Sequence, residues 1–259
     1  MEQPPPQQTD YNKPQSKRER PAPLNTEPFR RPGTTPSDDE AFNRLLPIAS
    51  AQRGMWMGEK IGPSDAVYKL AEYVDIGGDV DVPTFLKASQ LLTKEAESTR
   101  VQIVETAEGA RQLVNEQYPG EFPFLDFSAE DDAEAHALRW MNDEVSRPVD
   151  LEREALWLGV LIKLSEQRYF WYQRCHHITL DGFGGGLLAR RLADIYNGLL
   201  AGGDIGESPF LPLVQQLEEE KAYRESSRIE RDRDYWKSQL AGLPDAISLS
   251  QRSAPRSGG

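Results

Sequence analysis

The feature that most constrains this chain is an aromatic segment at residues 169–175 that is followed directly by two adjacent histidines. The residues of interest that follow it are His176, His177, Asp181 and Gly182. Three glycines at 184–186 then open a run in which apolar residues recur at helical spacing up to residue 200. The sequence therefore predicts a strand, a glycine-rich loop and a helix, in that order, with the histidines at the end of the strand. Loops held between such rigid elements often carry catalytic groups.

Patterns elsewhere predict the rest of the fold. Strands are expected at 67–76 and 156–164, and a hairpin around Gly109 is expected to join 99–105 to 111–115. Ser50, Asp81 and Ser128 are placed to cap helices. Two charged helices are expected at about 213–226 and 228–240.

Composition divides the chain and excludes some functions. Nine prolines fall within residues 1–36, so residues 1–38 are expected to be a disordered leader, 39–249 the folded region and 250–259 a flexible tail. The net charge of -12 argues against a nucleic-acid partner, and no apolar run reaches the 18 residues or so of a membrane span. One cysteine, with no secretory signal pattern, fits a cytoplasmic protein.

The residues alone leave several interpretations of the histidine pair open. Both histidines could be structural, and a metal site would need a third ligand that no nearby spacing supplies. A serine triad would need a Gly-x-Ser-x-Gly elbow, which the sequence lacks. A histidine that titrates near neutral pH is suited to moving a proton from an amine or a thiol, and loop amides at a helix start favour an oxyanion. Alternate strand residues face opposite sides, so His176 and His177 are not expected to share one task.

Residues 176–182 match the HHxxxDG motif of condensation domains of nonribosomal peptide synthetases, which is shared with the wider chloramphenicol-acetyltransferase-like superfamily. Residues 50–56, 148–151 and 231–236 resemble further condensation motifs, and Arg100 matches the last arginine of the second motif. Residues 171–174 and 221–226 are most similar to a siderophore synthetase of this family. The chain departs from the second motif at Glu95, Ala96 and Thr99, where the family has Arg, His and Leu.

This resemblance implies an α/β fold, an α+β sandwich in which helices pack on a mostly antiparallel sheet. It implies a chain that covers the N-terminal lobe of a truncated condensation domain. The implied reaction joins a carrier-bound acyl or peptidyl thioester to the amine of a carrier-bound aminoacyl thioester. The implied partners are the carrier proteins, which bring their own phosphopantetheine arms, and the rest of the synthetase. No cofactor or metal is expected in the lobe itself.

The resemblance also implies a role for each motif residue. His177 would be the catalytic base or would position the acceptor amine, and His176 would support it. Asp181 would form an ion pair with an arginine and fix the loop, and Gly182 would let the backbone approach the thioester. Two alternatives stay open: an acyltransferase of the same superfamily that uses a soluble thioester, and a non-catalytic lobe that only docks carriers.

Overall fold

The computed structural model describes residues 45–62, 67–115 and 122–243, and these fall into two compact units that divide between residues 208 and 209. The expected leader at 1–38 and tail at 250–259 lie outside the described residues. None of the described helices is long and apolar enough to cross a membrane.

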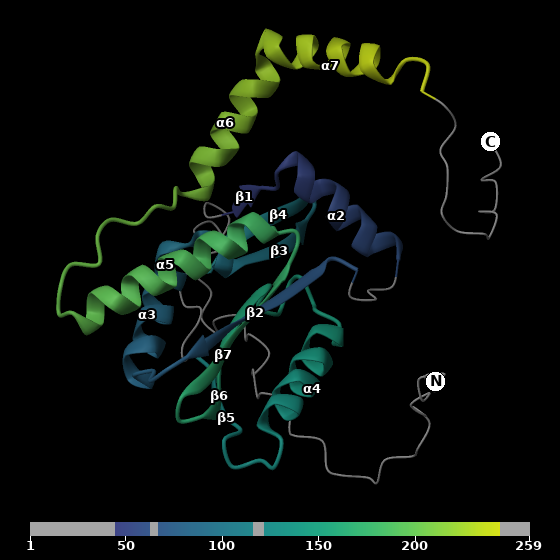
Figure 1. Cartoon of the computed structure of the whole chain (residues 1–259). Coiled ribbons are helices and arrows are strands. Elements are labelled where there is room, and N and C mark those ends of the chain that lie inside the picture. The colour runs from purple at the N-terminus through teal and green to yellow at the C-terminus, as the bar shows by residue number, and fades with distance from the viewer. Residues whose placement is uncertain (1–44, 63–66, 116–121, 244–259) are drawn as a thin grey trace, which may run out of the picture. The chain divides into compact units, whose positions relative to one another are not determined.

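The first unit is built on a four-stranded sheet with the order β2-β7-β6-β5 (Figure 1). Its strands are β2 (Lys69–Gly77), β7 (Arg168–His176), β6 (Trp157–Ser165) and β5 (Phe124–Asp126). The pairs β2–β7 and β6–β7 are antiparallel, and the short β5 pairs with β6 in parallel. The strand that ends in the histidines is thus an inner strand, hydrogen-bonded on both sides and buried over almost its whole length.

A second sheet of three strands has the order β1-β4-β3, from β1 (Leu45–Pro47), β4 (Gly109–Val114) and β3 (Val101–Thr106). A short 3-10 turn, η1 (Glu97–Arg100), leads into β3. The hairpin expected around Gly109 is confirmed, and Gly109 has the positive φ of 108° that its turn requires. The mostly antiparallel α/β architecture is confirmed, but it consists of two sheets where the pattern suggested one.

Helices cover both faces of the larger sheet (Figure 1). One face packs against α4 (Ala133–Ser146) through a cluster of buried residues: Ala137, Trp140, Met141, Leu158, Val160, Ile162, Leu164, Phe170 and Tyr172. On the other side lie α3 (Val82–Glu95) and α5 (Gly182–Leu200), which contact each other through the rings of Phe85 and Tyr196, 5.6 Å apart. The helix α2 (Ser50–Ile61) precedes β2.

The second unit contains α6 (Leu213–Glu225) and α7 (Ser227–Leu240), as the charge pattern predicted. Ser226 caps α7 through the amide of Arg228, and the Tyr223 hydroxyl donates a 2.8 Å hydrogen bond to Asp232.

Several predicted boundaries were wrong. Ala49, not Ser50, is the residue before α2, and Asp132, not Ser128, caps α4; Ser128 instead bonds to Asp126 in a turn. The three glycines at 184–186 are not a loop but lie within α5, which begins at Gly182. The strands β1 and β5 were not predicted, because three residues are too few to show an alternating pattern.

Candidate active site

The motif residues occupy the connection between β7 and α5. His176 is the last residue of β7, and Asp181 is the residue that precedes α5. Pairing with β2 extends one residue past the strand, because the amide of His177 donates a 2.6 Å hydrogen bond to the carbonyl oxygen of Tyr68. The loop turns through two further bonds, from the amide and the hydroxyl of Thr179 to the carbonyl of His176, both 3.0 Å. The backbone on either side of His177 is therefore fixed.

His176 is buried, with 2% of its surface exposed, and both ring nitrogens have partners. Its Nδ1 accepts a hydrogen bond from the amide of Ile178 at 3.2 Å, so the ring proton must sit on Nε2, which lies 3.2 Å from Oε1 of Glu59. Burial lowers the pKa of His176, and the carboxylate of Glu59 opposes that shift only in part. A neutral, doubly hydrogen-bonded ring is suited to holding the loop rather than to transferring protons.

His177 has a different environment. It is half-buried, and within the described part of the chain no hydrogen bond or ion pair occupies its ring nitrogens. The two histidines therefore differ as the strand alternation predicted. Of the pair, His177 is the one whose ring remains available to a substrate.

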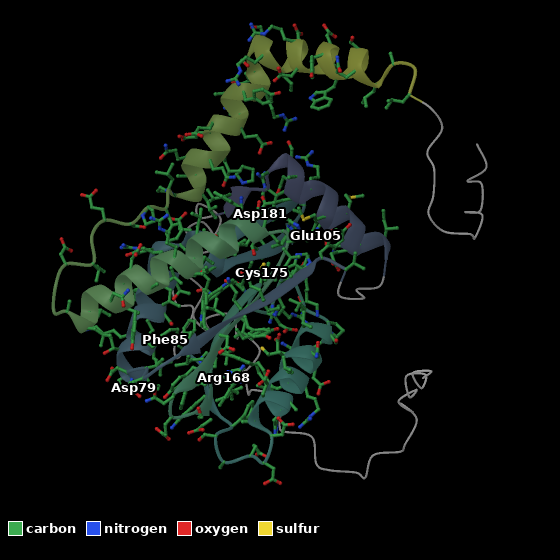
Figure 2. The ribbon with its side chains drawn as sticks, in the orientation of Figure 1. Asp79, Phe85, Glu105, Arg168, Cys175 and Asp181 are labelled. Carbon is green, nitrogen blue, oxygen red and sulfur yellow. The ribbon has the colours of Figure 1, made fainter. Side chains whose placement is uncertain are left out.

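Asp181 is placed differently from expectation. Its carboxylate is exposed and accepts a 2.7 Å hydrogen bond from the amide of Gly184, which makes it the N-cap of α5. Among the described residues no arginine forms an ion pair with it, so the expected ion pair stays a prediction. Figure 2 labels Asp181, which precedes α5, and Cys175, the second-last residue of β7.

Gly182 begins α5, and a Cβ built on it would meet no atom within 4 Å, so the space beside its backbone is open. Gly184 and Gly185 donate their amides to Asp181, whereas the amides of Gly182 and Phe183 have no acceptor among the described residues. Free amides at a helix start carry partial positive charge and can bind an oxyanion.

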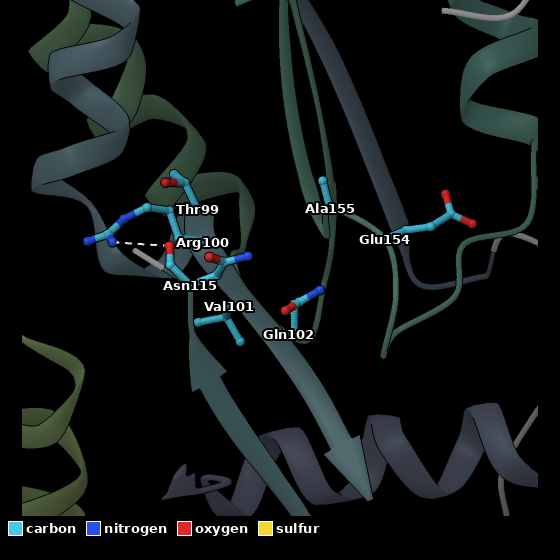
Figure 3. Close-up of a pocket in the computed structure, with 7 residues that line it drawn as sticks. All are labelled: Thr99, Arg100, Val101, Gln102, Asn115, Glu154 and Ala155. Carbon is cyan, nitrogen blue, oxygen red and sulfur yellow. Dashed lines mark hydrogen bonds between the residues drawn. The ribbon is translucent and has the colours of Figure 1, made fainter. Parts of the chain in front are cut away.

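Two hollows in the described part of the chain are not lined by His177. One is a cavity of about 10 Å³ beside Arg100, with space for about one water molecule (Figure 3). The other, of about 460 Å³, lies between α2 and residues 149–153 and reaches Glu59. Among the described residues, no group of three His, Cys, Asp or Glu side chains could hold a metal ion.

The sequence did not single out two further residues at the loop, Gln52 and Glu59. Both lie on α2, where Gln52 bonds to the carbonyl of Ile178 at 2.8 Å and Glu59 contacts His176. They are seven residues apart, two helical turns, so they project from the same face of α2. That spacing within residues 50–59 was the signal available in the sequence.

Comparison with known proteins agrees with this arrangement. The family model for the condensation domain matches residues 43–258. A dimodular nonribosomal peptide synthase of Bacillus subtilis is 38% identical over 209 residues, which are 81% of this chain and 9% of that protein. Enterobactin synthase component F of Escherichia coli O157:H7 is 33% identical over 211 residues, 81% of this chain and 16% of that protein. The likeness to a siderophore synthetase, enterobactin synthase component F, is thereby confirmed.

Solved structures give the same result. A mutant of the starter condensation domain of rhizomide synthetase, in complex with C8-CoA, superposes with a TM-score of 0.79 at 31% identity and covers 84% of this chain. The first condensation domain of the CDA synthetase gives a TM-score of 0.71 at 27% identity over 80% of this chain. The chain spans about half of these solved domains, 50% and 53%, and a small part of the curated synthetases.

Proposed function

Because this chain belongs to the condensation-domain family of nonribosomal peptide synthetases, we propose that it supplies the catalytic histidine of an amide-forming domain. The donor is an acyl or peptidyl thioester on one carrier protein, and the acceptor is the amine of an aminoacyl thioester on another. The observation that carries the proposal is the contrast between the two motif histidines: His176 is buried and bonded on both sides, whereas the ring of His177 has no partner among the residues that the structure describes.

In this proposal the free ring nitrogen of His177 takes a proton from the acceptor nitrogen as that nitrogen attacks the thioester carbonyl. A C–N bond forms and the carbonyl oxygen becomes an oxyanion. The amides of Gly182 and Phe183 at the start of α5, which have no acceptor in the described part of the chain, are the donors offered to that oxyanion. When the tetrahedral intermediate collapses, the C–S bond breaks and the pantetheine thiolate leaves with the proton that His177 holds.

The other motif residues hold this arrangement in place. His176 supports the loop through its two ring hydrogen bonds. Asp181 fixes the start of α5 by capping Gly184, and Gly182 leaves open space beside the backbone for the thioester. The carrier proteins provide the phosphopantetheine arms, and the lobe itself requires no cofactor or metal. A positioned base contributes about 10²–10⁴ in rate, and alignment of the two tethered reactants contributes the rest.

The test uses the complete natural protein that contains this chain, with donor-loaded and acceptor-loaded carriers and product detection by mass spectrometry. His177→Ala should lower amide formation by about 10²-fold or more while the melting temperature stays near that of the parent. The matched control is His136→Ala, on α4, which should retain activity. Retention of condensation by a folded His177→Ala variant would contradict the proposal.

A second arm of the same assay replaces the carrier-bound donor by the same acyl group on coenzyme A. A clear preference for the coenzyme A donor would favour the soluble-thioester acyltransferase. Turnover with neither donor would favour a lobe that only docks carriers.

A further inference from the structure

The helix α2 carries two side chains that contact the residues on either side of His177: Gln52 bonds to the carbonyl of Ile178, and Glu59 bonds to the ring of His176. We propose that Gln52 and Glu59 are positioning residues for His177, and that they act by holding the two peptide groups that flank Ile178. This inference rests on the proposed catalytic role of His177. It assigns a task to one face of α2, of which the sequence analysis identified only residues 50–56, as a family motif.

Gln52 holds the carbonyl side. Its Oε1 accepts the amide of Ala49 at 2.7 Å, and since an amide must be a donor, this bond fixes which end of the Gln52 side chain is the NH₂ group. Its Nε2 then donates to the carbonyl oxygen of Ile178 at 2.8 Å and to Oε1 of Gln112 at 3.3 Å.

Gln112 makes the orientation of Gln52 unambiguous. Gln112 is buried on β4 and donates through its own Nε2 to the carbonyl of Pro47 at 2.8 Å, so its Oε1 must be the acceptor that faces Gln52. Every donor in this network therefore meets an acceptor. The network links the smaller sheet and the start of α2 to the loop that carries His177.

Glu59 acts on the amide side through His176. The carboxylate accepts from Nε2 of His176, and this leaves Nδ1 without a proton and able to accept the amide of Ile178. If the proton moved to Nδ1, the ring and the Ile178 amide would present two donors to each other. An acceptor at position 59 therefore selects the tautomer that holds the loop.

Together these contacts fix the backbone on both sides of Ile178. Gln52 and Glu59 are two turns apart on one helix face, and the amide of His177 itself is held by Tyr68. A rotation of the loop that would move His177 relative to the start of α5 must break at least one of these bonds. Misplacement of a reacting group by about 1 Å can cost about 10²-fold in rate, so a modest displacement should be visible in kcat.

The decisive variant is Gln52→Glu, assayed in the complete natural protein. A glutamate keeps the acceptor for Ala49 but presents oxygen, not NH₂, to the carbonyl of Ile178 and to Gln112. We expect kcat for amide formation to fall about 10-fold with KM within about 2-fold, because the change affects alignment and not carrier binding. Hydrogen exchange measured on a peptide covering residues 176–180 should become faster. The charge-matched control is Gln216→Glu, exposed on α6, which should change neither quantity.

Two variants at position 59 test the acceptor itself. Glu59→Gln can still accept from His176 Nε2 and should retain most of the activity, whereas Glu59→Leu cannot and should match Gln52→Glu in both readouts. The control for the lost charge is Glu230→Gln, exposed on α7. Equal loss in Glu59→Gln and Glu59→Leu would overturn the assignment, because the charge and not the hydrogen bond would then matter.

The outcomes separate the two proposals. If the parent condenses in a His177-dependent way but Gln52→Glu retains its kcat and its exchange rate, the positioning role is wrong and the proposed function stands. If Gln52→Glu only lowers the melting temperature, the contact is structural and the inference is again wrong. If the parent shows no His177-dependent condensation, the proposed function fails, and the exchange measurement alone decides whether Gln52 holds the loop.

Discussion

Arg191 on α5 donates two hydrogen bonds of 2.8 Å to the carboxylate of Glu95 at the end of α3. The guanidinium also donates to the carbonyls of Ile205, at 2.7 Å, and of Gly206, at 3.1 Å. Glu95 stands where the second family motif has an arginine, so this chain locks α3 to α5 with a carboxylate at that position. The pair therefore holds α5 against α3, and the first residues of α5 adjoin the loop that carries His177.

Loss of this pair should be costly, because the side chains of Arg191 and Glu95 are only 6% and 17% exposed. Arg191→Met should lower the free energy of unfolding of the complete domain by about 3 kcal/mol, since it leaves a largely buried carboxylate and two carbonyls without a donor. Denaturant unfolding measures this. The double variant Arg191→Met/Glu95→Leu should recover part of the loss, because no charge is then left unpaired.

The control for this prediction is the exposed pair Lys60–Glu105, in which Glu105→Ala should cost less than about 0.5 kcal/mol. Equal costs for Arg191→Met and Glu105→Ala would show that the buried pair has no special weight.

Local sequence patterns predicted the elements around the site well. The aromatic run before His176 became β7, and Asp81 caps α3 as expected, through the amide of Thr84 at 2.8 Å. Capping and alternation are decided by residues within a few positions of one another, which a single sequence displays.

What the sequence could not show depends on distant contacts. Glu59 meets His176 across 117 positions, and Arg191 meets Glu95 across 96, and no local pattern encodes such pairs. The ion pair expected for Asp181 came from the family resemblance and not from its neighbours. Asp181 stands at a helix start, three residues before Gly184, and that local position favours the N-cap that the structure contains.

Asp181→Ala should lower the stability and the rate together. Removal of an N-cap carboxylate costs about 1 kcal/mol, and the start of α5 would lose the bond that fixes Gly184 beside the histidine loop. The matched control is Asp132→Ala, which removes the equivalent cap of α4 at 3.0 Å, away from the loop. Both variants should show a similar loss in urea unfolding, but only Asp181→Ala should lower the condensation rate. If Asp132→Ala lowered the condensation rate as much as Asp181→Ala, the loss of stability alone would explain the lower rate of both variants.

Gly185→Ala should be less stable than Gly186→Ala. A Cβ on Gly185 would lie 2.9 Å from Oε1 of Glu72 and 3.3 Å from Nε2 of Gln173, whereas a Cβ on Gly186 would meet nothing within 4 Å. Replacing glycine by alanine inside a helix gains about 0.5–1 kcal/mol where there is space, so Gly186→Ala should raise the melting temperature. At position 185 the gain should be lost, because the Glu72 carboxylate must move from its 2.5 Å bond with Gln173.

The pair Gly185→Ala/Glu72→Ala checks the cause of that loss. If the clash with Glu72 is responsible, adding Glu72→Ala should restore the alanine gain at position 185. No recovery in thermal melts would assign the loss to the backbone of α5 instead.

The last prediction concerns the pH dependence of stability. Burial lowers the pKa of His176, while Glu59 from α2 raises it and Arg174 on β7 and the neighbouring His177 lower it further. An unfolded chain therefore binds a proton at His176 as pH falls below about 6.5, before the folded chain does. The contribution of His176 to the free energy of unfolding should thus be fully present above about pH 6.5. As the pH drops below that value, this contribution should decrease by up to about 1.4 kcal/mol per pH unit. The free energy of unfolding, measured in urea, should decrease between pH 7.5 and pH 5.5. The decrease should be larger for the parent and for the control His136→Gln than for His176→Gln, which cannot titrate at that position. Equal pH dependence in all three proteins would show that His176 is not held neutral in the fold.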